Sequence, residues 1–333
     1  MLNQSNFLPF SSYMSKSVFM NSIKLIIFSL LLVTASWAAT SNSSLDQQLR
    51  DAASEGNTDV LTALIEKGAN IDAPGKYGKT PLMYAAELGN INVIGILLSH
   101  NANVNARTAS GSTALTFAAE NGHASVTAML VQFGANVHDR TRAGWNSLMI
   151  AAKNGYDVIV AQLLEFGADV RSSDRKGNSA MMYAIQAGHT KVIHTLFKYS
   201  DLVAPCLPNN QGITPLMAAI DNKQQEIIDI LLPVTKNLDF VDKYGASVLH
   251  YAVSTNNLKL VKSLIGMKGV TINLQDEDGA TPLLEAVEIG AVSIVSFLLK
   301  NGVDINLKNN EGKTAQQLAE EKGNKEIIEL FKK

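Results

Sequence analysis

An internal repeat of about 33 residues constrains the fold of this chain more than any other feature. Eight glycines recur at spacings of 33 to 35 residues. A period of this length is typical of repeat proteins, in which each unit packs only against its neighbours. We therefore expect one elongated array rather than the two ordinary domains that 333 residues would suggest. The marker glycines are Gly78, Gly111, Gly144, Gly177, Gly212, Gly245, Gly279 and Gly312.

Each repeat opens with a run that predicts a short helix. In residues 80–86 (TPLMYAA), Thr80 can cap the helix, and Pro81 suits the first turn because no N–H is needed there. Gly89 can end the helix by adopting a left-handed conformation. A second apolar run at residues 93–98 has helical spacing. Each unit is therefore predicted to be a pair of short helices.

These runs, and the turn at residues 167–170 (GADV) that closes a unit, resemble the ankyrin repeat family. The resemblance covers residues 44–333 and implies an all-α solenoid of about nine helix–turn–helix units with β-hairpin loops. A single unit cannot bury its apolar face, so the units must stack and the array must end in polar caps. We place these caps at residues 44–74 and 312–333.

The sequence departs from the family pattern after the Thr-Pro-Leu run. A histidine usually follows there and bonds to neighbouring backbone, but only His250 fits that pattern here. Methionine replaces it at Met83, Met149, Met182 and Met217. We expect adaptable apolar packing in place of the hydrogen bond.

A second departure marks residues 199–243 as an irregular junction. The unit after Gly177 is two residues longer and contains Pro205 and Pro208, and the next unit contains Pro233. We expect the stacking to be least regular here. A hinge, a binding feature and harmless drift in a surface loop remain open as interpretations, and so does the redox state of Cys206.

Residues 1–38 are predicted to be a cleavable signal peptide. A lysine at position 24 precedes the apolar run 25–33, and the small residues Ser36 and Ala38 follow at cleavage spacing. The apolar run is about half the length of a membrane-spanning helix, so no stable membrane anchor is expected after cleavage.

The true start of translation is open between Met1 and Met20. A short linker at residues 39–43 would join the signal peptide to the array.

Composition and motifs exclude several classes of function. With 28 Lys and Arg against 30 Asp and Glu, the chain is not a polybasic nucleic-acid binder. One cysteine cannot form an intrachain disulfide or a cysteine-based zinc site. His123 and His189 lie two repeats apart, roughly 20 Å, which is too far to share a metal. Since the repeat uses nearly every residue, we expect no catalytic site, metal or cofactor.

The resemblance also implies where a partner binds. In ankyrin arrays, the positions that flank the marker glycine and the exposed end of the first helix form a concave contact surface. The corresponding residues are Lys76, Tyr77, Lys79, Arg142, Trp145, Lys153, Arg175, Lys176, Gln186, Ile213, Tyr244, Glu277, Asp278 and Glu288.

Charge is distributed unevenly along this surface. Five of the six arginines fall within residues 107–175, whereas residues 276–288 are acidic. Arginine binds carboxylates in a forked geometry, and arginine beside an exposed tryptophan is typical of binding hot spots. We hypothesise that an acidic protein segment docks around Arg142, an exposed Trp145, and Arg175. The alternative, a solvated charged rim without a dedicated partner, remains open.

The sequence thus predicts a non-catalytic scaffold for protein–protein interaction. The plain signal peptide favours export to a bacterial periplasm or out of the cell. Three alternatives stay open: a secreted effector that captures a host protein, a stabiliser of a periplasmic enzyme, and an enzyme without a recognisable motif.

Overall fold

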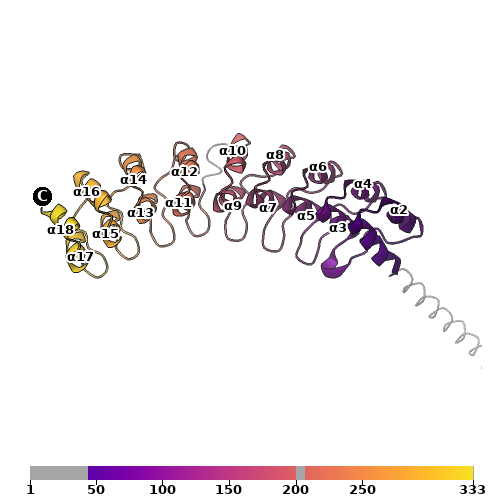
Figure 1. Cartoon of the computed structure of the whole chain (residues 1–333), viewed down its shortest axis with the longest axis horizontal. Helices are drawn as coiled ribbons and strands as arrows, with labels where there is room; N and C mark the ends of the chain where they lie inside the picture. The colour runs from indigo at the N-terminus through magenta and orange to yellow at the C-terminus, as the bar shows by residue number, and fades with distance from the viewer. Residues whose placement is uncertain (1–43, 200–206, 333) are drawn as a thin grey trace, which may run out of the picture.

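The computed structural model describes residues 44–199 and 207–332, and these form one elongated helical arch (Figure 1). The predicted signal peptide, the linker at 39–43 and Cys206 lie outside the described residues. No helix in the described ranges is both long enough and apolar enough to cross a membrane.

The helices form two layers. Odd-numbered helices make an inner layer next to the hairpin loops, and even-numbered helices make an outer layer (Figure 1). A helical segment at residues 44–55 precedes them, and the short 3-10 helix η1 spans Lys76–Gly78. The α-helices are α2 (Thr58–Glu66), α3 (Pro81–Leu88), α4 (Ile91–Ser99), α5 (Ala114–Glu120), α6 (Ala124–Gln132), α7 (Ser147–Asn154), α8 (Asp157–Glu165), α9 (Ala180–Ala187), α10 (Thr190–Lys198), α11 (Pro215–Asp221), α12 (Gln225–Leu231), α13 (Val248–Ser254), α14 (Leu258–Leu264), α15 (Pro282–Glu288), α16 (Val292–Lys300), α17 (Ala315–Glu321) and α18 (Lys325–Phe331).

The helices begin and end as the repeat predicts. Thr80 caps α3 through its side chain, and Pro81 is the first helical residue. Gly89 ends α3 with a φ of 76°, in the left-handed region that favours glycine. Lys223 and Asn256 adopt the same conformation in repeats where this glycine is replaced. The backbone path is therefore kept even where the preferred residue is absent.

The histidine and methionine positions differ in chemistry, as expected. His250 Nδ1 lies 3.1 Å from the N–H of Ser247, and its Nε2 lies 3.2 Å from the carbonyl of Ala280 in the next repeat. In α3, the sulfur of the buried Met83 lies 3.4 Å from the N–H of Thr80. Sulfur is a weaker acceptor, so methionine supplies mainly packing where histidine joins two repeats.

The hairpin loops are tight turns rather than extended strands. In the second loop, the N–H of Thr108 bonds to the carbonyl of Ser112 and closes the turn at 2.9 Å. The N–H of Ala109 bonds to the carbonyl of Tyr77 in the preceding loop, also at 2.9 Å. The strand pairing of the described residues consists of isolated bridges, as between Ser173 and Ser179. Backbone bonds thus connect successive loop tips.

The core runs through the whole array. Paired alanines such as Ala85 and Ala86 are fully buried on the inner helices, and their small size allows neighbouring helices to approach closely. Each outer helix adds larger residues, such as Ile94 and Leu97 on α4. Every inner helix from α3 to α17 contacts the next one, so the core is continuous.

The outer layer is less regular within residues 199–243. Other neighbouring outer helices from α2 to α18 pack more closely than α12 packs against α10 and α14. Side-chain hydrogen bonds of 3.3 Å still link α12 to both sides, from Thr190 to Glu226 and from Asn257 to Gln225. The chain after α12 differs from the other repeats, since Pro233 follows within two residues of its end. Inner helices α9, α11 and α13 still pack in sequence. The irregularity is therefore confined to the outer side.

Because the loops stack closely, Gly212 should not tolerate a side chain. Its φ is 77°, and an added Cβ would lie 2.4 Å from the carbonyl oxygen of Val241 in the next loop. We expect Gly212→Ala to lower the unfolding free energy by about 2 kcal/mol or more.

Gly95 is the matched control, because it lies within α4 and an added Cβ meets nothing within 4 Å. Gly95→Ala should raise stability by about 0.5–1 kcal/mol. Urea unfolding followed by circular dichroism measures both changes, and shifts of the same sign would contradict the prediction.

Candidate partner-binding face

All the predicted contact residues lie on hairpin loops or adjoining inner helices, along the concave side of the arch (Figure 1). Lys79, Trp145 and Ile213 are half-buried, and the others are exposed. The structure gathers eight of them around two cavities. The other six line neither cavity: Trp145 and Lys153 lie just before and on α7, and Tyr244, Glu277, Asp278 and Glu288 lie farther along the array.

The first cavity, which we call the N-terminal groove, spans the loop tips of three successive repeats and has a volume of about 700 Å³. Predicted residues Lys76, Tyr77, Lys79 and Arg142 line it together with Phe117 of α5. The Lys79 ammonium lies 4.3 Å from the centre of the Phe117 ring and also pairs with Glu87. The floor of the groove is therefore aromatic, and the charge of Lys79 beside it is neutralised by Glu87.

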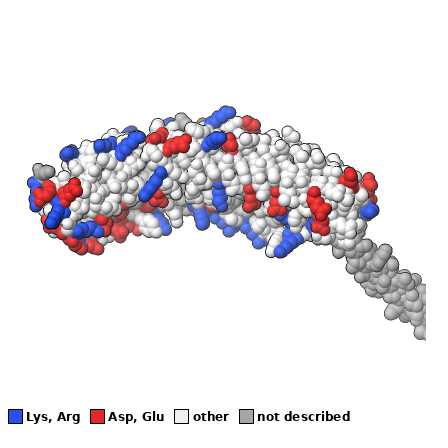
Figure 2. Space-filling view, viewed as in Figure 1, with Lys and Arg blue, Asp and Glu red and all other residues white. Residues whose placement is uncertain are grey.

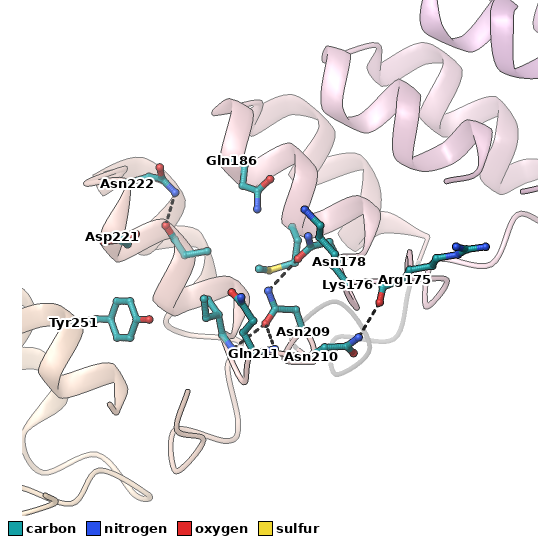
Figure 3. Close-up of a pocket in the computed structure, with 13 residues that line it drawn as sticks. Arg175, Lys176, Asn178, Gln186, Asn209, Asn210, Gln211, Asp221, Asn222 and Tyr251 are labelled. Carbon is teal, nitrogen blue, oxygen red and sulfur yellow. Dashed lines mark hydrogen bonds between the residues drawn. The ribbon is translucent and has the colours of Figure 1, made fainter. Parts of the chain in front are cut away.

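The second cavity lies between α9 and α11 and has a volume of about 550 Å³ (Figure 3). Lys176 and Gln186 extend into it from the α9 side, and the hydroxyl of Tyr251 points toward it from the other side (Figure 3). Arg175 points away from these groups (Figure 3). Ile213 completes the predicted set at this cavity.

Side-chain amides make up much of the second cavity, and sequence reasoning predicted Gln186 but missed Asn209 and Asn210. Asn209 donates to the amide oxygen of Asn178 at 3.0 Å, and Asn210 donates to the carbonyl of Arg175 at 3.0 Å. The run of amides at 209–211, just before a marker glycine, was the available signal. These bonds tie the loop to the preceding repeat.

The expectation of an exposed Trp145 is wrong. Its ring is half-buried, and its centre lies 4.1 Å from that of the buried Tyr183. The Lys153 ammonium sits 5.2 Å from the tryptophan ring centre. Tyr183 donates to Asp174 at 2.6 Å, and burial and this bond raise the tyrosine pKa. Trp145 is thus a fixed wall of the surface rather than a free aromatic side chain.

The arginines divide into structural and available groups. Arg107 pairs with Asp139 at 2.9 Å in the next repeat, and Arg140 donates to the carbonyl of Ser173 in the repeat after its own. Arg142 and Arg175 are exposed and form no ion pair or side-chain hydrogen bond within the described part of the chain. Two adjacent loop tips therefore present unpaired guanidinium groups.

The charge asymmetry is visible on the surface. Basic side chains gather along the hairpin edge beneath α5, α7 and α9, and acidic ones gather beneath α15 (Figure 2). The acidic end includes Asp276, Glu277 and Asp278 on one loop and Glu288 on α15, which pairs with Lys322. Acidic partner segments are therefore favoured near the middle of the array and basic ones toward the C-terminal end.

His123 and His189 join neighbouring repeats. Their Nε2 atoms lie 2.9 and 3.0 Å from the carbonyls of Glu87 and Lys153, one repeat back. Both side chains therefore contribute to stacking, a role that their position after the helix-ending glycine did not reveal.

Comparison with known proteins identifies the family. A model of ankyrin repeats in three copies matches residues 49–141, 115–206, 202–276 and 249–333. This chain belongs to the ankyrin repeat family. Ankyrin repeats are modules for protein–protein interaction, so the concave face is the surface to examine for a partner.

Similar proteins come from distant sources. The chain is 36% identical over 81 residues to a probable 26S proteasome regulatory subunit p28 of Saccharomyces cerevisiae, which covers 24% of this chain and 36% of that protein. It is 28% identical over 124 residues to the putative ankyrin repeat protein YahD of Escherichia coli, covering 36% and 62% respectively. For the putative ankyrin repeat protein FPV223 of fowlpox virus, identity is 37% over 87 residues, covering 26% and 59%. In each case the match spans less than two thirds of the relative's length.

Glu285 provides a pH-dependent test of the acidic end. It is half-buried on α15, and burial together with the nearby Asp276 carboxylate raises its pKa from 4.5 to about 7. The folded state therefore favours the protonated form. Its stability contribution is complete below pH 4.5 and is lost as the pH rises through 7. As the pH rises from 4.5 to 8, the unfolding free energy of Glu285→Gln should rise by about 2–3 kcal/mol relative to that of the wild type, because glutamine does not titrate.

Urea unfolding at pH 4.5, 6 and 8 measures this difference, with Glu277→Gln on the neighbouring loop as the matched exposed control. Parallel pH profiles for the wild type and Glu285→Gln would show that Glu285 does not titrate in this way.

Proposed function

We propose that this chain is an exported, non-catalytic scaffold that binds a protein partner on its hairpin and inner-helix face. The partner contributes an acidic segment that docks around Arg142, Trp145 and Arg175. Membership of the ankyrin repeat family supports the general role, and the charges and contacts of the face support the more specific one.

The observation that carries the proposal is that the Arg142 and Arg175 side chains are exposed and unpaired. Arg107 and Arg140 bond to the following repeat, whereas these two remain unpaired and exposed within the described residues. An exposed guanidinium can take a carboxylate through two parallel hydrogen bonds. Beside them, Trp145 is held by Tyr183, so its surface is presented without a large entropy loss on binding. This combination favours an acidic protein surface over a neutral one.

The export proposal rests on the layout of residues 1–38. A basic start, a short apolar run and small residues at positions 36 and 38 are the features of a secretory signal. Such a protein meets its partner outside the cytoplasm.

We expect the double variant Arg142→Glu, Arg175→Glu to lose its partner. Tagged protein is produced in its native cell, and the proteins that co-purify are identified by mass spectrometry. Reversal of two contacting charges should weaken binding at least tenfold, because attraction becomes repulsion at each site.

The charge-matched control is Lys191→Glu, Lys259→Glu, since both lysines are exposed on the outer helices α10 and α14. Equal recovery with both double variants would refute the proposed face. A partner from the cell's own envelope would favour a scaffold or stabiliser, and a partner found only in host extracts would favour an effector.

We expect the mature protein to begin at Ala39. Mass spectrometry of the N-terminal peptide from exported protein tests this directly, and Ala38→Phe should block cleavage because the site requires a small residue. Recovery of the intact N-terminus on the wild-type protein would argue against a cleaved signal.

A further inference from the structure

We infer that the N-terminal groove is an anchor site for one large apolar side chain, aromatic or long aliphatic, flanked by carboxylates in the partner segment. This inference rests on the proposed binding of an acidic segment and names the residue pattern that the segment carries.

The groove owes its space to a small residue between two long ones. Lys76, Ala109 and Arg142 occupy equivalent positions on three successive loops, two residues before each marker glycine. The alanine in the middle leaves a gap, and all three residues line the cavity of about 700 Å³. This volume is within the range of small-molecule pockets and exceeds the needs of one large side chain.

The walls of the groove are apolar and aromatic. Tyr77 forms one side and is 73% exposed, so most of its ring surface is open to a bound segment. Phe117 forms the floor, and Ala109 and Ala143 form the tips of the next two loops. Burial of an apolar side chain here would remove exposed aromatic surface on both partners from water.

The position of Tyr77 is fixed by its backbone. Its φ is 61° and ψ is 17°, the left-handed region that residues other than glycine seldom occupy. Its carbonyl accepts a hydrogen bond from the N–H of Ala109 on the next loop. The backbone at the mouth of the groove is therefore fixed before a partner arrives, and the Lys76 ammonium lies 4.9 Å from the ring centre, so less freedom is lost on binding.

The charges around the groove specify its occupant. Lys76 and Arg142 lie at opposite ends and form no ion pair in the described chain, while Lys79 on the floor is neutralised by Glu87. A side chain bound between these two cations is therefore best flanked by acids. A neutral apolar segment would leave Arg142 without a carboxylate and Lys76 with only its contact to the Tyr77 ring, 4.9 Å from the ring centre.

Geometry sets the spacing of those acids. Lys76 and Arg142 lie two repeats apart, roughly 20 Å if each repeat adds the usual helix-packing distance. An extended chain advances about 3.3–3.6 Å per residue. The two acids should therefore stand about six residues apart, with the apolar anchor midway. Arg175, one loop farther on, would meet a third acid about three residues later.

The test uses labelled peptides and the full chain. One peptide carries Asp at two positions six residues apart with Trp midway, a second has Ala in place of Trp, and a third has Asn in place of both Asp. Fluorescence anisotropy measures their affinities for the wild type and for Ala109→Leu. This substitution fills the gap at an exposed position without changing the charge.

We expect the Trp peptide to bind at least tenfold more tightly than the Ala peptide, and Ala109→Leu to abolish that difference while leaving the Ala peptide unchanged. If the Trp and Ala peptides bind equally, the anchor site is refuted and the binding of an acidic segment stands. If neither acidic peptide binds more tightly than the Asn peptide, the acidic-segment proposal fails as well.

Discussion

Everything in this structure depends on the stacking of one repeat against the next. A pair of helices of seven to nine residues is too small to bury its own apolar face. The paired alanines of the inner layer permit close approach, and backbone hydrogen bonds join successive loop tips. Because such contacts recur along the array, a modest local energy becomes a long and continuous core. The same recurrence places equivalent side chains in a row on the concave face, where small differences between repeats create distinct sites.

Polar side chains of the loops and inner helices have one of two roles. Some join repeats, as Arg107 does with Asp139 and as His250 does with the carbonyl of Ala280. Those not used in this way, notably Arg142 and Arg175, leave their guanidinium groups exposed on the surface. Two residues of the same type one repeat apart can therefore have opposite roles, and composition alone does not separate them.

The sequence predicted the helices, the turns and the array because these depend on local rules that recur in every unit. It also placed the candidate residues on one face, since that placement follows from the repeat register. It failed for Trp145, because the ring contact with Tyr183 lies between different repeats and has no local signal. It missed Asn209 although a run of amides marks the loop, because the bond from Asn209 to Asn178 joins different repeats. A contact between repeats depends on which side chains face each other across the interface, and only the three-dimensional structure shows this.

The sparser packing of α12 against its outer neighbours affects how the array loses its structure. In a linear array, cooperativity is transmitted only through adjacent interfaces, so a weaker interface divides the molecule into blocks. Residues on either side of α12 are then coupled mainly through the inner layer. Under mechanical load or mild denaturant, the N-terminal block that contains the groove can stay intact while the acidic block opens. The N-terminal half and the remainder of the protein would thus have separate lifetimes.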